Sequence, residues 1–279
     1  KALRQHFKSV GLTNLDDMTL VESALRSFRE QLDSRVAKGE ISPGYVYALT
    51  RAARPMFTMA WENRIIPEMP RCLSAISTKP RYVPQAKPLT RMQVHQLWAV
   101  ADDRMRCWIA LGLNCGLYAV DLSDMKADEL IQFEGSTYLA RYRSKTKAPG
   151  KWKLWPITVE LISRVRNDQP DGRLFTTLRG QPLLVKTRKS ISDHVANQLY
   201  KLLPQAGTKV SFSQLRDTGA AFIESWGRKQ GDNLVTSCYL AHADPRMARN
   251  YLATSPAKLD TGRLDEATDE FGRFLNLTV

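Results

Sequence analysis

Two side chains near the carboxyl end of this 279-residue chain are of types suited to chemistry on a phosphate group. His242 ends the run YLAH at 239–242, and Tyr251 stands nine residues after it. A tyrosine hydroxyl has a pKa of about 10, so it needs cationic neighbours before it can attack a phosphorus atom at neutral pH. The alternative for Tyr251, one of nine tyrosines, is a half-buried side chain whose hydroxyl makes an ordinary hydrogen bond.

Cationic side chains that could surround such a phosphate occur in two earlier segments. Arg216 lies in the run SQLRDT at 213–218, and its planar guanidinium can donate to two phosphate oxygens at once. The other segment contains four lysines: Lys145, Lys147, Lys151 and Lys153. We take Lys145 as the candidate, although any of the four could be a solvated charge on a hairpin. Arg216, likewise, could pair with a surface carboxylate.

The elements that would position these side chains are mostly helical. Residues 1–75 have helical patterning, and Asp16 or Asp17 can cap one of the helices. The apolar face of that helix is expected to consist of Leu20, Ala24, Leu25 and Phe28. A second strong helix begins at 42–44, and Pro55 bends or locally breaks it. Arg51 and Arg54 lie on a stripe beside the apolar face of this second helix.

A proline-rich stretch separates this helical part from the rest of the chain. Residues 79–88 include Pro80, Pro84 and Pro88, and prolines at this density favour an extended, semi-stiff linker. The sequence therefore predicts three parts: a helical domain over 1–78, a linker over 79–88 and a second domain over 89–279.

The second domain is predicted to combine helices with one small sheet. Thr90 and Gln93 form a capping box at the start of its first helix, and a helix over 104–114 stops at Gly116. Short strands are expected at 130–133, 137–143 and 152–157, with turns near Gly135 and 148–150. Further helices are expected at 159–166, 188–203, 213–226 and 245–252.

The charge of the chain points to a polyanionic partner. It carries 41 Lys and Arg against 28 Asp and Glu, a net charge of +13, with a sequence pI of about 9.7. Nucleic acid is the commonest partner of such a surface, the alternative being a ribosome-associated or merely basic enzyme. Basic residues exceed acidic ones by 13 to 8 in residues 1–85 and by 28 to 20 in residues 86–279. Both parts are therefore expected to contact one duplex.

The composition also excludes several classes of protein. The sequence has no run of about 18 apolar residues, as a membrane span requires, and residues 1–10 lack the apolar stretch of a signal peptide. The four cysteines are scattered along the chain and form no CxxC pair. We expect a cytoplasmic protein without membrane contact, structural metal or cofactor.

Taken in order, these motifs resemble those of the tyrosine recombinases, the phage-integrase family. YLAH at 239–242 is similar to the family's leucine-glycine-histidine element, and Tyr251 follows at the family's usual distance. SQLRDT at 213–218 overlays the family motif H-x-L-R-H-T, and SKTK at 144–147 resembles the family's lysine hairpin. The resemblance covers nearly the whole chain. It implies a mostly α fold with a small three-stranded antiparallel sheet, in which a helical core-binding domain and a catalytic domain clamp double-stranded DNA.

The resemblance also implies a role for each matching residue. Tyr251 would attack a backbone phosphate and form a 3′-phosphotyrosine, while Arg216 and His242 surround that phosphate. Lys145 would protonate the departing 5′-oxygen. The side chains expected to bind DNA outside this site are Arg51, Arg54, Lys147 and Lys151.

Two positions depart from the family pattern. The run GLYAVDL at 116–122 overlays G-L-R-x-x-E-L, but Tyr118 stands where the family has its first catalytic arginine. Ser213 stands at the motif histidine, and a hydroxyl cannot act as a general acid or base as an imidazole can. Losing one pre-organised donor costs about 10²–10³ in rate in analogous sites.

Three interpretations follow from these residues. The first is a divergent recombinase that integrates or excises a mobile element, favoured by the presence of both His242 and Tyr251. The second is a recombinase-derived DNA-binding protein without strand exchange, favoured by Tyr118 and Ser213. The third is an unrelated basic helical protein, which does not explain why the motifs occur in the family's order.

The last segment is expected to dock on a catalytic domain. Five apolar side chains fall on one face of a probable helix: Leu264, Ala267, Phe271, Phe274 and Leu275. The receiving domain is either the chain's own or that of a neighbouring molecule. Docking on a neighbour would support self-association on DNA.

Overall fold

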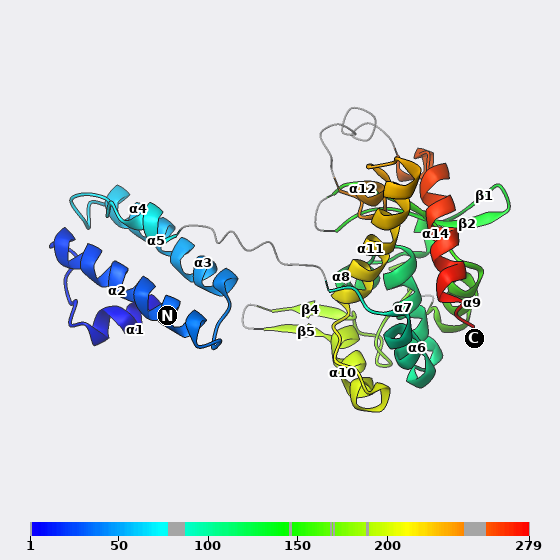
Figure 1. Cartoon of the computed structure of the whole chain (residues 1–279), viewed down its shortest axis with the longest axis horizontal. Helices are drawn as coiled ribbons and strands as arrows, with labels where there is room; N and C mark the ends of the chain where they lie inside the picture. Colours follow the sequence, from blue (N-terminus) through cyan, green and yellow to red (C-terminus); the bar gives the residue numbers. More distant parts are fainter. Residues whose placement is uncertain are drawn as a thin grey trace. The chain divides into compact units, whose positions relative to one another are not determined.

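The computed structural model describes residues 2–77, 87–144, 147–167, 169, 171–187, 190–242 and 255–278, and it separates into two compact units, Lys1–Gln85 and Ala86–Val279 (Figure 1). The helices of the first unit are α1 (Ala2–Ser9), α2 (Met18–Ala37), α3 (Pro43–Arg51), α4 (Ala53–Glu62) and α5 (Leu73–Ile76). They enclose a small core of their own that includes Leu25, Phe28, Val46 and Phe57.

Helix α2 begins at Asp17, whose carboxylate accepts hydrogen bonds from the N–H groups of Thr19 and Leu20. Of the two predicted caps, Asp17 is therefore the one used. The predicted apolar face is wrong at one position, because Leu20 is 56% exposed whereas Val21 is fully buried. The cap fixes where the helix starts, and the packing of α2 against α1, α3 and α5 decides which stripe faces inward.

The predicted second helix is two helices, α3 and α4, which meet at Ala52. Pro55 explains the break, because it has no N–H to donate to the carbonyl of Arg51 and its ring crowds that carbonyl. The side chains of Arg51 and Arg54 are both exposed, and both line one surface hollow of this unit.

The second unit is built around α7 (Asp103–Asn114), which is buried on nearly all sides. The other helices are α6 (Arg91–Val100), α8 (Ala119–Ser123), α9 (Pro156–Val165), α10 (His194–Ala206), α11 (Ser213–Gln230), α12 (Val235–Tyr239) and α14 (Gly262–Leu275), with short 3-10 turns at Ala127–Glu129 and Pro256–Lys258. The capping box of Thr90 and Gln93 is confirmed at the start of α6. Gly116 has a φ of +61°, the left-handed conformation expected just after a helix end.

The three-stranded antiparallel sheet is confirmed. It consists of β1 (Leu130–Phe133), β2 (Ser136–Tyr142) and β3 (Pro149–Lys153), in the order β1-β2-β3. The third strand begins three residues earlier than predicted and ends sooner. Pro149 is tolerated because it is the first residue of a strand at the edge of the sheet. Gly150 is required there, since the Trp152 ring fills the space that a Cβ would occupy.

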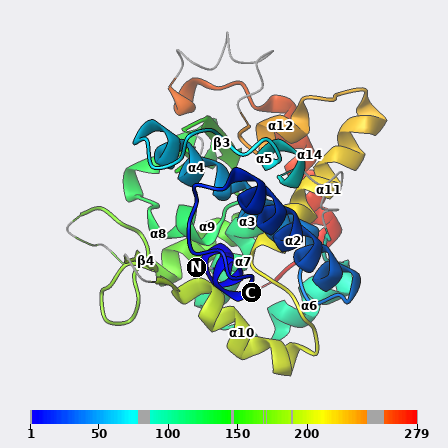
Figure 2. The ribbon, with the colours of Figure 1, turned by 90° about the vertical axis from the view of Figure 1, so that its left-hand side faces the viewer.

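The prediction of a helix from residue 188 is wrong. A two-stranded hairpin, β4 (Leu184–Lys186) and β5 (Ile191–Asp193), comes first, and α10 begins only at His194. Asp193 caps that helix by accepting a hydrogen bond from the N–H of Ala196. Helices α10 and α6 then lie side by side (Figures 1 and 2).

Helix α14 packs along α11 in its own unit (Figure 1). Its buried apolar side chains are Leu264, Ala267, Phe271 and Leu275. Phe271 stacks on Phe222 with ring centroids 4.7 Å apart, and Trp155 donates from its indole nitrogen to the carbonyl of Thr268. Phe274 is 46% exposed, so it does not belong to the buried face as predicted.

Candidate functional site

Four segments that are far apart in the sequence meet around the carbonyl oxygen of Gly116. Arg216 Nη1 donates to this oxygen at 2.6 Å, and Arg143 Nη2 donates to it at 2.5 Å. Arg216 comes from the first turn of α11, whereas Arg143 directly follows β2. Gly116 thus holds two guanidinium groups at one point, and the left-handed conformation of its backbone presents the carbonyl to both.

Arg216 also reaches the segment that follows α12. Its Nη2 donates to the carbonyl of Leu240 at 2.9 Å and lies 3.4 Å from Nε2 of His242. The predicted partners Arg216 and His242 are therefore adjacent. Arg216 is only 4% exposed, and burial lowers the pKa of its guanidinium. A buried cation of this kind is stabilised by any anion that can reach it.

His242 is placed by a tight turn, since Ala241 just before it has a φ of +41°. Its side chain is exposed on one side and meets Arg216 on the other. Partial burial, together with the positive charges of Arg216 and Arg143, lowers the pKa of the imidazole. The ring is therefore neutral at pH 7, and with its proton on Nδ1 it can accept from Arg216 through Nε2.

Tyr118 lies against both arginines. The centroid of its ring is 4.9 Å from the guanidinium carbon of Arg216 and 5.7 Å from that of Arg143. Its backbone N–H donates to the Asp121 carboxylate at 2.9 Å. At the position where the family has a charged fork, this chain presents an aromatic face to two cations, an arrangement that is itself attractive.

Arg143 was not among the residues that the sequence analysis selected. It is 3% exposed, and its Nη1 lies 3.6 Å from the carboxylate of Asp121. Burial, and then the charge of Arg216, lower the pKa of Arg143 to about 10, so it stays protonated at neutral pH. A usable signal was present, because strand alternation places Arg141 and Arg143 on one face, and both prove to be buried.

The electrostatics of this cluster are unbalanced. Among the described residues, the carboxylate of Asp121 forms an ion pair with Arg143, whereas Arg216 forms none, so two buried guanidiniums lie beside one buried carboxylate. Buried charges are stable when they are paired, so a surplus positive charge favours the binding of an anion. A phosphate diester, with one negative charge and two non-bridging oxygens, matches this surplus in sign and in geometry.

The other predicted residues have different placements. Ser213 is exposed, one helical turn before Arg216, with its hydroxyl 3.0 Å from that of Ser211. Lys147 is exposed in the turn between β2 and β3. Lys151, in contrast, is 5% exposed, donates to the carbonyl of Leu259 and lies over the Phe133 ring. Its burial argues against the predicted contact between Lys151 and DNA.

The predicted nucleophile Tyr251 and the predicted acid Lys145 lie outside the described residues, as does the expected helix at 245–252. Tyr239 is close to the arginines but is not a substitute nucleophile. It is fully buried, its hydroxyl donates to the carbonyl of Leu113 at 2.6 Å, and burial raises the pKa of that hydroxyl. Tyr239 therefore braces α12 against α7.

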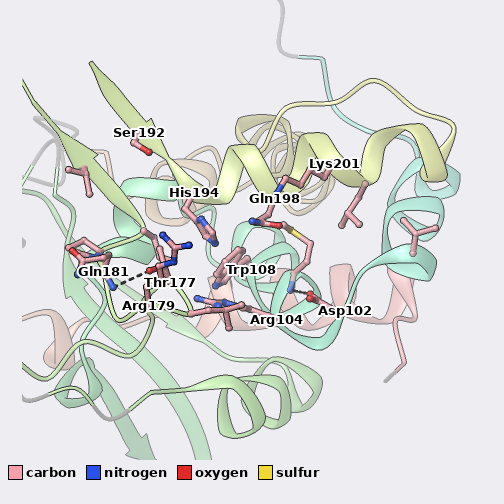
Figure 3. Close-up of a pocket in the computed structure, with 17 residues that line it drawn as sticks. Asp102, Arg104, Trp108, Thr177, Arg179, Gln181, Ser192, His194, Gln198 and Lys201 are labelled. Carbon is pink, nitrogen blue, oxygen red and sulfur yellow. Dashed lines mark hydrogen bonds between the residues drawn. The ribbon is translucent and has the colours of Figure 1, made fainter. Parts of the chain in front are cut away.

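A separate cavity of about 610 Å³ lies between α7, α10 and the loop that precedes β4. Figure 3 shows Trp108 between Arg104, whose guanidinium carbon is 4.9 Å from the centre of the ring, and His194. The arginine cluster around Gly116 does not line this cavity. Within the described residues, no group of three or more His, Cys, Asp or Glu side chains could hold a metal ion. None of the described helices combines the length and apolar character of a membrane span.

Comparison with known proteins gives no match to any protein-family model or to any curated protein sequence. Solved structures do match. Lambda integrase bound to DNA has a TM-score of 0.56 and 14% identity, with 100% of this chain and 98% of that chain covered. XerH recombinase bound to its difH substrate has a TM-score of 0.58 and 17% identity, covering 86% of this chain and 68% of that one. The Tn1549 transposon integrase, in complex with a circular intermediate DNA, has a TM-score of 0.54 and 18% identity, covering 84% and 81%.

The chain therefore has the fold of the tyrosine recombinases, as its motifs indicated. The predicted fold class, mostly helical with a small three-stranded antiparallel sheet, is confirmed. At these sequence identities the structural similarity establishes the fold alone. The chemistry of the site has to be inferred from its own residues.

Proposed function

We propose that this protein binds double-stranded DNA and breaks and rejoins it as a tyrosine recombinase, through a 3′-phosphotyrosine formed by Tyr251. The observation that carries the proposal is the meeting of Arg216 and His242, 3.4 Å apart, beside a surplus of buried positive charge. A DNA phosphate is the anion most suited to that site in a basic protein of this fold. Integration or excision of a mobile element is the corresponding process.

In this mechanism the chain's residues act on one phosphate. Arg216 would hold a non-bridging oxygen, and neutral His242 would donate a second hydrogen bond from the edge of the ring that faces solvent. Tyr251 would attack the phosphorus atom, and Lys145 would protonate the 5′-oxygen that leaves. The roles of Tyr251 and Lys145 rest on motif spacing alone.

A second candidate is a recombinase-derived protein that binds DNA without strand exchange. The specific observation in its favour is that Tyr118 and Ser213 replace two groups on which the family's chemistry depends. The two candidates differ in one measurable property, which is whether a covalent bond to DNA forms.

The test begins with selection of bound sequences from a random duplex library, because the target site is unknown. Selected duplexes are then rebuilt with a nick that lets the released fragment, which carries the free 5′-hydroxyl, escape. The protein–DNA adduct is followed on denaturing gels. We expect an adduct with the wild-type chain and none with Tyr251→Phe, whose DNA affinity should stay nearly unchanged. Tight binding by the wild type without any adduct would establish the second candidate. An adduct that survives Tyr251→Phe would refute Tyr251 as the nucleophile.

DNA contact by both units is a further part of the proposal. Each neutralised phosphate contributes about −0.9 to the slope of log K against log salt concentration. Arg51, Arg54 and Lys147 are exposed and available for such contacts. Neutralising both Arg51 and Arg54 should therefore flatten the slope, and an unchanged slope would count against a role for the first unit.

Self-association on DNA through the C-terminal segment is also proposed. Helix α14 buries most of its apolar face on its own unit, while Phe274 stays 46% exposed. Phe274→Glu should weaken multimer bands in gel-shift assays while leaving the first complex intact. Multimers of undiminished strength would contradict a contact through Phe274.

A further inference from the structure

Arg143 supplies a guanidinium that the family pattern in this sequence lacks. At Tyr118 the chain has an aromatic ring in place of a charged fork. Yet the site still contains two guanidiniums, because Arg143 arrives from the end of β2 and donates to the same carbonyl oxygen as Arg216. Both groups also lie against the Tyr118 ring.

Arg143 is buried with an incomplete set of partners among the described residues. Its nearest carboxylate, Asp121, is 3.6 Å away and already accepts the N–H of Tyr118. Its Nε is buried and has no hydrogen-bond partner among the described residues. A buried, unpartnered donor on a charged group costs free energy in the empty site, and that cost is relieved when an anion accepts from it.

From these observations we infer that Arg143 is a phosphate-binding catalytic residue, which grips one non-bridging oxygen of the DNA phosphate while Arg216 grips the other. This inference rests on the proposed function and adds to it the source of the second charged fork. No bond to Arg143 forms or breaks, because its contribution is to stabilise negative charge as the phosphorus atom is attacked.

The inference also explains why Tyr118 is compatible with activity. An arginine at 118 would place a third positive charge beside Arg143 and Arg216, with Asp121 as the single paired carboxylate of the cluster in the described structure. The tyrosine instead offers its π face to both guanidiniums without adding charge. Position 118 and position 143 are then alternative sources of one guanidinium.

The chain offers a matched control at Arg141. This residue lies two positions earlier, is equally buried at 4%, and donates to the backbone carbonyl of Asp121 at 2.5 Å. Like Arg143, it has a carboxylate 3.6 Å away, that of Glu129, and a buried Nε without a hydrogen-bond partner among the described residues. Replacing Arg141 therefore removes a buried guanidinium with similar surroundings. In the described structure, Arg143 and Arg216 donate hydrogen bonds to the carbonyl of Gly116, whereas Arg141 does not.

The first experiment measures the rate of adduct formation on the nicked duplex for Arg143→Ala, Arg143→Lys and Arg141→Lys. We expect a fall of about 10²–10³ for Arg143→Ala, the size found when one pre-organised donor is removed. Arg143→Lys keeps a charge without the fork and should also be slow, whereas Arg141→Lys should stay near the wild-type rate. The double variant Tyr118→Arg with Arg143→Ala should recover part of the lost rate. Near wild-type rates for a folded Arg143→Lys or Arg143→Ala would overturn the inference.

A second experiment separates this inference from the proposed catalysis. The unfolding temperature of the full chain is measured against inorganic phosphate concentration, with ionic strength held constant by sodium chloride. Phosphate should raise the unfolding temperature of the wild type and of Arg141→Lys, and should raise that of Arg143→Lys much less. If the wild type forms no adduct, the proposed catalysis fails and this measurement alone decides the role of Arg143. Equal stabilisation of Arg143→Lys and wild type would then refute phosphate binding by Arg143.

Discussion

Substitution of Gly116 by alanine perturbs the point on which the whole arginine cluster depends. The residue has a φ of +61°, and its carbonyl accepts from both Arg143 and Arg216. A Cβ at this position would lie 3.0 Å from the Tyr239 ring and 3.3 Å from Nη1 of Arg216. The ring cannot retreat easily, because Tyr239 is fully buried and its hydroxyl is bonded to the carbonyl of Leu113.

Two costs add in this variant. Holding an alanine in the left-handed region costs about 1–2 kcal/mol. Forcing a methyl group into a packed interior costs about 1–3 kcal/mol more. Gly116→Ala should therefore lower the free energy of unfolding by about 2–5 kcal/mol, which corresponds to at least about 4 °C in unfolding temperature for a unit of this size.

Gly135→Ala is the matched control. Gly135 has a φ of +72° in the turn between β1 and β2, and nothing lies within 4 Å of the position of its missing Cβ. Gly135→Ala should therefore lower the free energy of unfolding only by the backbone cost of about 1–2 kcal/mol. Urea unfolding of the full chain, followed by tryptophan fluorescence, suits this comparison because five of the six tryptophans belong to the second unit. If Gly116→Ala is no less stable than Gly135→Ala, the proposed crowding against Tyr239 and Arg216 is refuted.

Five further substitutions test other parts of the site. Tyr239→Phe removes the hydrogen bond to the Leu113 carbonyl, so urea unfolding should show a loss of about 1–3 kcal/mol; full stability would mean that this bond contributes nothing. Tyr118→Arg alone should lower the unfolding temperature and should not accelerate adduct formation, because it adds a third cation to the cluster; a faster variant would show that the site still lacks a charged fork. Lys151→Met should leave the salt dependence of DNA binding unchanged, whereas Lys147→Met should flatten the slope by about 0.9; the reverse pattern would restore Lys151 as a DNA contact. The pKa of His242 is lower in the folded chain than in the unfolded chain, so the unfolded chain binds the proton more readily and the folded state loses stability as pH falls below the ordinary histidine value. His242→Gln should therefore reduce the loss of unfolding temperature at acid pH. Identical pH profiles of unfolding temperature for the variant and the wild type would contradict this sign.

Local patterns were sufficient to predict much of the fold. Asp17, together with the capping box of Thr90 and Gln93, marked helix starts correctly, because a cap is a contact between residues two or three positions apart. The three strands were found because short extended patterns and turn residues alternate there, although pairing of Pro149 with Tyr142 starts the third strand earlier than predicted. The hairpin before α10 was missed because it pairs residues as far apart as Leu184 and Asp193. Patterns that repeat every two or every three to four residues do not reveal such pairing.

The sequence by itself determined the fold class and two neighbours at the site, Arg216 and His242, because their motifs have characteristic types and order. Only the tertiary structure decided that Arg143 joins them, that Lys151 turns inward and that Tyr118 lies against two cations. The physical reason is range. The bond from Arg143 to Gly116 spans 27 residues, and that from Arg216 to Gly116 spans 100. Which guanidinium reaches a shared carbonyl depends on how the end of β2 packs against α7 and α11, and no local pattern carries that information.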